Sequence, residues 1–292
     1  MRPILLAGVA GRTPARPLAR REWPPPGRRD KGGRAAPQHH AARRPGSTML
    51  LLRSLAFNVA FYALTAAMLI GGLFCLVSRR LVLRLAQTWA RVTLWLLERI
   101  VGIRVEFRGL EHIPPGGIIV AAKHQSALET IALTTVLPNF TYILKRELLW
   151  LPLFGWYLSR GEMVPIDRRK GSRALALMSE EAAGAMAQGR QLIIFPEGTR
   201  RPPGAPPAYK FGVAHLYDRL AVPCLPVALN TGLVWPRNSL HRHPGTAVIA
   251  FLPPIPPGIV RETAFALIQE RIETASAALL ADTSRRGGEV PA

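Results

Sequence analysis

Residues 118–137 read IIVAAKHQSALETIALTTVL, and this stretch decides the class of fold. Five consecutive apolar residues, 118–122, predict a short strand that is buried on both faces. A polar segment follows at once, and residues 128–137 then predict a helix that ends before Pro138. A buried strand that runs through a short polar loop into a helix is typical of α/β proteins.

The chain on both sides of this stretch repeats the alternation of short apolar runs and helical patterns. The predicted strands are 103–108, 118–122, 141–144, 163–166, 191–195, 222–229 and 247–252, and the predicted helices are 128–137, 172–188, 212–220 and 262–281. We therefore predict an α/β fold with a mixed, largely parallel sheet covered by helices. To this fold the sequence adds an N-terminal membrane-anchoring helical segment.

The anchor prediction comes from 25 uncharged residues at 54–78, SLAFNVAFYALTAAMLIGGLFCLVS. As a helix this run would span about 37 Å at 1.5 Å per residue, which is enough to cross the hydrocarbon core with tilt. Its polar residues and its Gly-Gly pair also allow a helix that lies partly in one leaflet. Arg79, Arg80 and Arg84 follow the run, and such basic clusters prefer the cytoplasmic side of a membrane.

Residues 81–102 predict a second, amphipathic helix that carries Trp89 and Trp95. We interpret it as an interfacial helix with its indole rings at headgroup depth. The alternative is an ordinary core helix of the domain that follows.

Residues 1–48 are rich in Pro, Arg and Ala and hold eleven Lys or Arg and only two acidic residues. A basic arm for lipid or nucleic acid, a targeting peptide and upstream sequence translated from a mis-set start are three interpretations. We favour the last, with Met49 as the true start. The predicted domains are a disordered basic extension (1–48), a membrane anchor and interfacial helix (49–101), a catalytic α/β domain (102–285) and a tail (286–292).

The formal net charge of +20 comes from 38 basic and 18 acidic residues and suggests an anionic partner such as acidic lipid, nucleic acid or a phosphorylated substrate. The sequence has no helix-turn-helix or RNA-binding signature, so we expect no nucleic-acid partner. It has no GxSxG or HExxH motif for a hydrolase. Its two cysteines, Cys75 and Cys224, are far apart, so we expect neither a disulfide framework nor a metal site.

The first segment that carries chemistry is KHQSALE at 123–129, directly after a buried strand. His124 is a candidate general base, and Glu129 is a candidate partner that fixes its tautomer and stabilises the imidazolium. Ser126 and Glu129 also form a capping box for the helix that follows. The two interpretations are compatible, because His124 precedes the helix.

Three further segments stand out. Residues 195–201, FPEGTRR, follow a buried strand and offer backbone amides, a hydroxyl and guanidinium groups to a phosphate. Lys145-Arg146 precedes an apolar, aromatic run, which suits an amphiphile with a charged head. Residues 222–227, VPCLPV, predict a strand near an edge or a site, because it contains two prolines. Alternatively, these segments are a polar loop, a solvated turn and plain core.

Together and in this order, the four segments resemble the glycerophospholipid acyltransferase family, in particular the bacterial enzymes that acylate 1-acyl-glycerol-3-phosphate. The resemblance covers about residues 50–260 and is carried by His124-Gln125-Ser126, the basic pair, FPEGTR at 195–200 and VPCLPV at 222–227. It implies that His124 activates the acceptor hydroxyl, which attacks the thioester of acyl-CoA or acyl-carrier protein without an acyl-enzyme. That thioester is a co-substrate, and no cofactor or metal is implied.

The resemblance also implies roles for residues of the second and third segments. The acceptor phosphate would be bound by Lys145, Arg146, Glu197, Gly198, Thr199 and Arg200. The N-terminal helices would attach the enzyme to the cell inner membrane, with the catalytic domain on the cytoplasmic side. One residue departs from the family pattern: the usual acid five residues after the His is Asp, and this chain has Glu129. The implied product is phosphatidic acid; other lyso-lipids and glycerol-3-phosphate remain alternative acceptors, and a lipid hydrolase or a lipid-binding protein remains an alternative class.

Overall fold

The computed structural model describes residues 47–167 and 171–285, and the expectations for 1–46 and 286–292 lie outside these ranges. Seven strands form one sheet: β1 (Ile103–Arg108), β2 (Ile118–Ala122), β3 (Phe140–Lys145), β4 (Val164–Ile166), β5 (Gln191–Ile194), β6 (Cys224–Leu229) and β7 (Gly245–Phe251). The strand order is β1-β7-β6-β2-β5-β3-β4. All neighbours are parallel except β6 and β7, so the prediction of a mixed, largely parallel sheet is confirmed.

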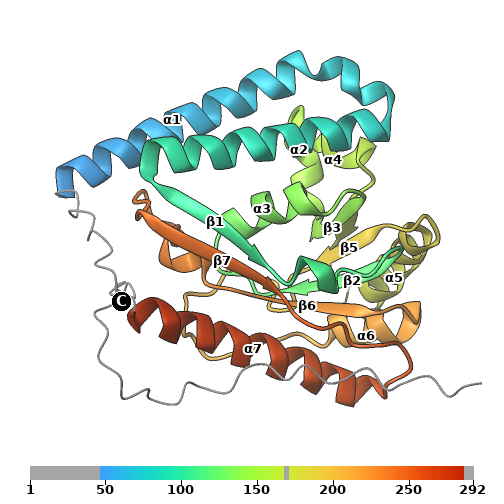
Figure 1. The fold of residues 1–292 in the computed structure, drawn as a ribbon. Coiled ribbons are helices and arrows are strands. Elements are labelled where there is room, and N and C mark those ends of the chain that lie inside the picture. Colours follow the sequence, from blue (N-terminus) through green and yellow to red (C-terminus); the bar gives the residue numbers. More distant parts are fainter. Residues whose placement is uncertain (1–46, 168–170, 286–292) are drawn as a thin grey trace, which may run out of the picture. The chain divides into compact units, whose positions relative to one another are not determined.

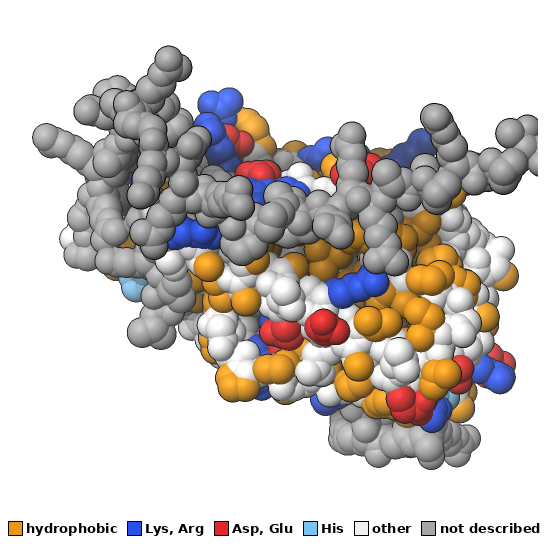
Figure 2. All heavy atoms as spheres, turned by 60° about the horizontal axis from the view of Figure 1, so that its bottom comes forward, with side chains coloured by type: hydrophobic (Ala, Val, Ile, Leu, Met, Phe, Trp, Pro, Cys, Tyr) orange, Lys and Arg blue, Asp and Glu red, His pale blue; other side chains and the backbone are white. Residues whose placement is uncertain are grey.

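Helices cover both faces of the sheet (Figure 1). The side chains of β2 alternate between the faces: Val120 packs in the cluster that includes Leu83 and Leu133, whereas Ile119 packs in the cluster that includes Met178 and Ile268. The first face is covered by α2 (Arg79–Leu96) and α3 (Leu128–Val136), and the second by α5 (Gly171–Ala187), α6 (Gly212–Leu220) and α7 (Arg261–Arg285). Figure 2 views the molecule from the α7 side, where acidic, basic and apolar side chains intermix over the uncovered part.

The remaining elements are short helical turns and one short helix. These are η1 (Leu73–Val77), η2 (Leu97–Val101), η3 (Leu110–His112), η4 (Arg146–Trp150), α4 (Phe154–Arg160) and η6 (Thr231–Leu233). The apolar run after Lys145 thus becomes η4 and α4 rather than one continuous helix.

The predicted anchor differs from the observed one in its bounds. Helix α1 spans Ser47–Gly71, so it begins before the uncharged run, includes Arg53 and ends seven residues before Ser78. Just after the helix end the chain passes close to α2: a Cβ at Gly72 would lie 2.4 Å from Leu85 Cδ2 and 2.5 Å from the Met68 carbonyl oxygen. Only glycine fits this approach, and the chain then turns through η1 into α2.

One flank of α1 is attached to the rest of the fold. Ser54 Oγ accepts a hydrogen bond from the Arg242 N–H at 2.9 Å, and Asn58 Oδ1 accepts one from the Arg242 guanidinium at 3.1 Å. Phe57 is fully buried against the edge of Trp235, with ring centroids 5.4 Å apart. Further along the helix, Trp89 Nε1 of α2 donates to Thr65 Oγ1. The other flank is exposed.

Among the described residues, α1 is the one helix that is long and apolar enough to cross a membrane, and only 11% of its most apolar window is buried. It is therefore a candidate membrane anchor. The amphipathic pattern predicted for 81–102 is also seen: α2 buries Val82, Leu83, Ala90 and Thr93 and exposes Trp95. Helix α2 thus packs on the α/β domain and at the same time supports α1.

Candidate active site

Three of the four predicted chemistry-bearing segments meet at one edge of the sheet. The polar segments of residues 123–129 and 195–201 follow β2 and β5, and Lys145 ends β3. These strands are adjacent and parallel, in the order β2-β5-β3, so their carboxyl ends lie at the same edge. Ligands of open α/β sheets bind outside the carboxyl ends of the strands.

His124 and Glu129 form a hydrogen-bonded pair at this edge. Nδ1 of His124 lies 2.8 Å from Oε1 of Glu129. The Glu129 side chain is fully buried, and that of His124 is 15% exposed. A carboxylate that accepts from Nδ1 fixes the tautomer in which Nε2 is the basic nitrogen.

Glu129 also caps the helix it starts. Its Oε1 accepts the backbone N–H groups of Gln125 at 2.8 Å and Ser126 at 2.7 Å, while Ser126 Oγ accepts the Leu128 N–H at 3.1 Å. Of the predicted capping box, the contact of Glu129 with the Ser126 N–H is present together with the His124 contact, whereas the N-cap residue of the helix is Ala127. Both follow from the position of Glu129 in the first turn of α3, where a negative charge is also favoured by the helix dipole.

The imidazole is held from its face as well as from its edge. The ring of Phe195, at the end of β5, stacks on the His124 ring with centroids 3.9 Å apart and planes 16° apart. Within the described ranges, Nε2 of His124 has no hydrogen-bond partner. The pair thus presents one basic nitrogen on a ring that cannot rotate freely.

Sequence reasoning missed the residues that follow β6. Thr231 Oγ1 donates to Oε2 of Glu129 at 2.6 Å, and the Gly232 N–H donates to Gln125 Oε1 at 3.1 Å. Thr231 lies 102 residues from Glu129 in the chain, so no local pattern connects the two. Since β6 is the parallel neighbour of β2 on the side away from β5, its carboxyl end reaches the same edge. The VPCLPV segment is thus an internal strand beside a site, and not an edge strand.

The resemblance implied that Glu197 contacts the acceptor phosphate directly. In the structure, its carboxylate lies among cations. Its carboxylate is fully buried, with Oε1 3.1 Å from Lys123 Nζ and 3.8 Å from Arg201 Nε. Its Oε2 accepts the His124 N–H at 3.4 Å. A buried carboxylate that is already paired with cations is a poor ligand for a phosphate, because like charges repel. It holds the loop that carries the neighbouring residues.

Lys123 joins this cluster to the C-terminal helix. Lys123 Nζ lies 2.5 Å from Glu273 Oε1 of α7, and Tyr209 donates to the same oxygen at 2.8 Å. Burial, and then the adjacent Glu273 carboxylate, raise the pKa of Tyr209, so the phenol stays protonated and donates. Strand alternation explains why adjacent residues differ: Lys123 continues the α7 side of β2, whereas His124 continues the α3 side.

The loop after β5 keeps a tight turn beside His124. Gly198 has a φ of +66°, which favours glycine, and its N–H donates to the Phe195 carbonyl at 2.9 Å. The Arg201 N–H donates to the His124 carbonyl oxygen at 2.8 Å. Thr199 is exposed and Arg200 half-buried, and the Arg200 guanidinium has no hydrogen-bond or ion-pair partner in the described part of the chain.

Lys145 and Arg146 are exposed at the end of β3, next in the sheet after β5. Burial raises the pKa of Glu181 of α5. Arg146 lies close enough to act in the opposite direction, since its charge favours the ionised carboxylate, but its effect is smaller. The structure brings both cations to the edge that holds His124, without a direct contact to the His124–Glu129 pair.

Two other groups lie apart from this edge. Burial raises the pKa of Cys224 to about 12, so its thiol stays neutral inside the core.

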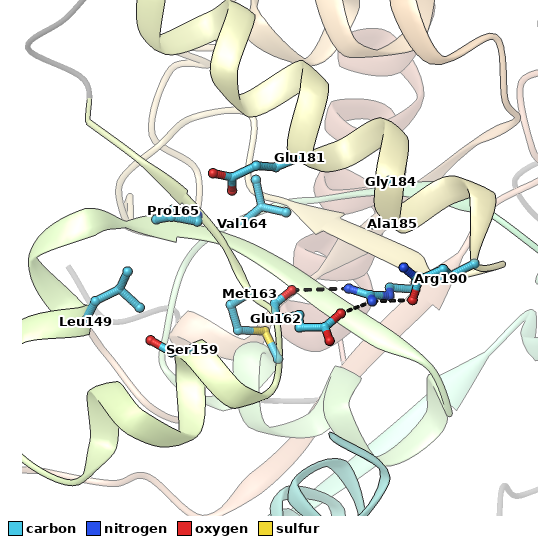
Figure 3. Close-up of a pocket in the computed structure, with 11 residues that line it drawn as sticks. Leu149, Ser159, Glu162, Met163, Val164, Pro165, Glu181, Gly184, Ala185 and Arg190 are labelled. Carbon is cyan, nitrogen blue, oxygen red and sulfur yellow. Dashed lines mark hydrogen bonds and ion pairs between the residues drawn. The ribbon is translucent and has the colours of Figure 1, made fainter. Parts of the chain in front are cut away.

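A pocket of about 410 Å³ includes residues at the amino ends of β4 and β5, the ends opposite His124. Figure 3 shows Arg190 hydrogen-bonded to Glu162 in the wall of this pocket. Within the described ranges, no three His, Cys, Asp or Glu side chains converge as metal ligands would.

Comparison with known proteins gives relatives of one kind. A 1-acyl-sn-glycerol-3-phosphate acyltransferase of Pseudomonas aeruginosa is 37% identical over 167 residues, which are 57% of this chain and 65% of that protein. The human 1-acyl-sn-glycerol-3-phosphate acyltransferase alpha is 34% identical over 169 residues, 57% of this chain and 60% of the human protein. The alignments thus span less than two thirds of either relative.

The fold and a family model agree with these relatives. The crystal structure of the 1-acyl-sn-glycerophosphate (LPA) acyltransferase PlsC from Thermotoga maritima matches with a TM-score of 0.66 and 25% identity, over 79% of this chain and 97% of that one. A model of the acyltransferase family matches residues 104–230, which contain His124, Glu129, Lys145, Arg146 and the loop after β5. Over these residues, the chain is similar to the acyltransferase family.

Proposed function

We propose that this protein transfers a fatty acyl group from a thioester, acyl-CoA or acyl-carrier protein, to the free hydroxyl of 1-acyl-glycerol-3-phosphate and so forms phosphatidic acid. The observation that carries the proposal is the His124–Glu129 pair at the carboxyl edge of the sheet, beside a loop whose Arg200 guanidinium has no partner among the described residues. The named relatives act on this class of acceptor.

The chemistry follows from the tautomer. Nε2 of His124 takes the proton of the acceptor hydroxyl while the hydroxyl oxygen bonds to the thioester carbonyl carbon. Glu129, which accepts from Nδ1 at 2.8 Å, stabilises the imidazolium that forms. The C–S bond then breaks, and the leaving thiolate takes the proton back from Nε2. The ester product and free thiol balance the reaction without a metal or a further cofactor.

The acceptor phosphate is assigned to the groups around the same edge. Arg200, Lys145 and Arg146 supply positive charge, and Gly198 and Thr199 supply a tight backbone turn and a hydroxyl. Arginine suits this task because its planar guanidinium binds phosphate oxygens in pairs. Glu197 stabilises this loop through its ion pairs with Lys123 and Arg201, and we assign it no contact with the phosphate.

Membrane attachment is assigned to α1 and α2. One flank of α1 contacts the rest of the fold from Ser54 to Leu69, whose carbonyl accepts from Tyr157 Oη at 2.7 Å. A helix bound along its side cannot also leave the domain to cross a bilayer. We therefore assign α1 to one leaflet, parallel to the surface, with the exposed flank in lipid. The basic residues Arg79, Arg80 and Arg84 favour the cytoplasmic side of the inner membrane.

The test is an acylation assay with the full chain in membranes and a panel of acceptors. Lysophosphatidic acid, glycerol-3-phosphate, a lyso-ornithine lipid and a zwitterionic lysophospholipid are each offered with acyl-CoA or acyl-carrier protein. We expect phosphatidic acid from lysophosphatidic acid, and a fall of about 10²- to 10⁴-fold in kcat for His124→Ala, the usual worth of a general base.

Two results contradict the proposal. Efficient acylation of another acceptor, with none of lysophosphatidic acid, overturns the acceptor assignment. Free fatty acid and thiol in place of an acylated lipid indicate a hydrolase.

A further inference from the structure

A group of large apolar side chains is exposed just beyond the catalytic edge. Trp150 is 67% exposed and Trp156 58%, and Leu151 and Phe154 between them are also exposed. We refer to these four residues as the 150–156 patch. Single exposed apolar residues are normal on a soluble surface, but four large ones within seven residues mark a contact surface.

The patch is held rigidly, and it is held against the bend that joins α1 to α2. Arg160 of α4 donates through Nε to the Leu76 carbonyl at 2.8 Å and also binds the Val77 carbonyl. Tyr157, whose side chain is buried, packs with Cys75 and Val82. Helix α4 therefore turns its inner side to the bend and its outer side, with Phe154 and Trp156, to the exterior.

The bend exposes apolar residues of its own. Leu73, Phe74 and Val77 of η1 are exposed, as is most of the outer flank of α1. Because α4 is bonded to η1, the 150–156 patch continues the apolar surface that begins on α1. The patch nevertheless comes from a separate part of the sequence, within the α/β domain.

The chemistry of the patch favours a phospholipid surface as its partner. Tryptophan rings prefer the headgroup region, where their apolar body and their N–H are both satisfied. The exposed cations Lys145, just before η4, and Arg146, its first residue, suit anionic headgroups. Both cations also lie at the catalytic edge, so contact here brings the bilayer next to the proposed phosphate site.

We propose that the 150–156 patch is a second membrane-contacting surface, which inserts between headgroups and sets the catalytic edge against the bilayer. The proposal rests on the proposed function only in that the acceptor is a lipid. It assigns to the α/β domain itself a part in membrane binding, so that a lipid acceptor passes from the bilayer to His124 without crossing water.

The test uses the full chain bound to vesicles of phosphatidylcholine and phosphatidylglycerol. Cys75 and Cys224 are buried, so a Trp156→Cys variant takes a bimane label at the new thiol. Val260→Cys is the matched control, because Val260 is 68% exposed just before α7, on the other side of the sheet. We expect nitroxide groups on the lipid acyl chains to quench the label at 156 and to leave the label at 260 unaffected.

Equal quenching at the two positions overturns the proposal. A second outcome also overturns it: in the absence of lipid, position 156 is protected from a water-soluble quencher, and this protection increases with protein concentration. The patch then binds a second copy of the chain. Neither reading depends on catalysis, so failure of the proposed reaction is distinguishable from failure of the membrane contact.

A kinetic measurement tests the same proposal without a label, so an effect of the label itself cannot influence it. The variant with both Trp150→Ser and Trp156→Ser is expected to show a several-fold higher KM for lysophosphatidic acid embedded in vesicles. Its KM for a short-chain acceptor dispersed as monomers in water is expected to stay unchanged, as is kcat. An unchanged KM for both acceptors contradicts the proposal, and so does an equal rise for both.

Discussion

Glu129 and Glu197 flank the carboxyl end of β2, and both side chains are fully buried. Their partners differ in kind. The four donors to Glu129 are two backbone N–H groups, a hydroxyl and the imidazole of His124, none of which is a permanent cation. Glu197 is paired with Lys123 and Arg201, which are cations at all physiological pH values.

We expect this difference to separate a catalytic carboxylate from a structural one. The other donors to Glu129 carry no formal charge, so an imidazolium formed at His124 would find its counter-charge in this carboxylate. The charge of Glu197 is already neutralised, so it adds little to catalysis and much to the integrity of the loop. Burial alone does not distinguish the two; the charge of the partners does.

The largest expected effect comes from Glu129→Gln. The amide oxygen still accepts the backbone N–H groups of Gln125 and Ser126, so the fold is kept, but the imidazolium loses its counter-charge. We expect kcat to fall by about 10³- to 10⁴-fold with little change in thermal stability, as measured by steady-state rates and a melting curve. Turnover near that of the wild type would reduce Glu129 to a helix cap, and Glu129→Asp, which retains the charge, should keep part of the activity.

The next effect is on stability, and it comes from Glu197→Gln. Removing one partner of a buried ion pair costs about 3–5 kcal/mol, and we expect the lower end because Glu273 still neutralises Lys123. The measurement is the denaturation midpoint of the detergent-solubilised chain. Glu270→Gln, at an exposed position one turn away from Glu273 on α7, is the matched control and should be neutral. If Glu197→Gln loses activity but not stability, the division between the two carboxylates is wrong.

The smallest effect is expected from Thr231→Val, which removes one neutral donor from Glu129 at constant shape. A hydrogen bond to a charged group is worth about 1.5–3 kcal/mol, part of which the three remaining donors supply. We expect kcat to fall roughly tenfold, consistent with about 1.4 kcal/mol, while the KM for the acceptor changes little. Thr231→Ser retains the hydroxyl and should restore the rate; failure of that rescue would show that packing, and not the hydrogen bond, is responsible.

Much of the fold follows from patterns in the sequence. The strands at 103–108 and 118–122 and the helix at 212–220 have the predicted bounds, and the other predicted strands differ from the observed ones by at most two residues at either end. The first helix begins and ends seven residues earlier than the uncharged run 54–78 from which it was predicted, because absence of charge was used to bound that run. Helix α1 tolerates Arg53 on its exposed flank, and it ends where Leu85 of α2 leaves no room for a Cβ at Gly72.

By itself, the sequence determined the alternation of strands and helices, the position of each polar segment at a strand end, and the pairing of His124 with Glu129. These are local properties: the pair spans five residues, and a helix start fixes its geometry. Only the tertiary structure decided the strand order, and with it the contacts of Glu129 with Thr231 and of Lys123 with Glu273, which are 102 and 150 residues apart. It also decided that Glu197 is buried and paired with Lys123, because the burial and the electrostatic partners of a side chain come from elements that are distant in the chain.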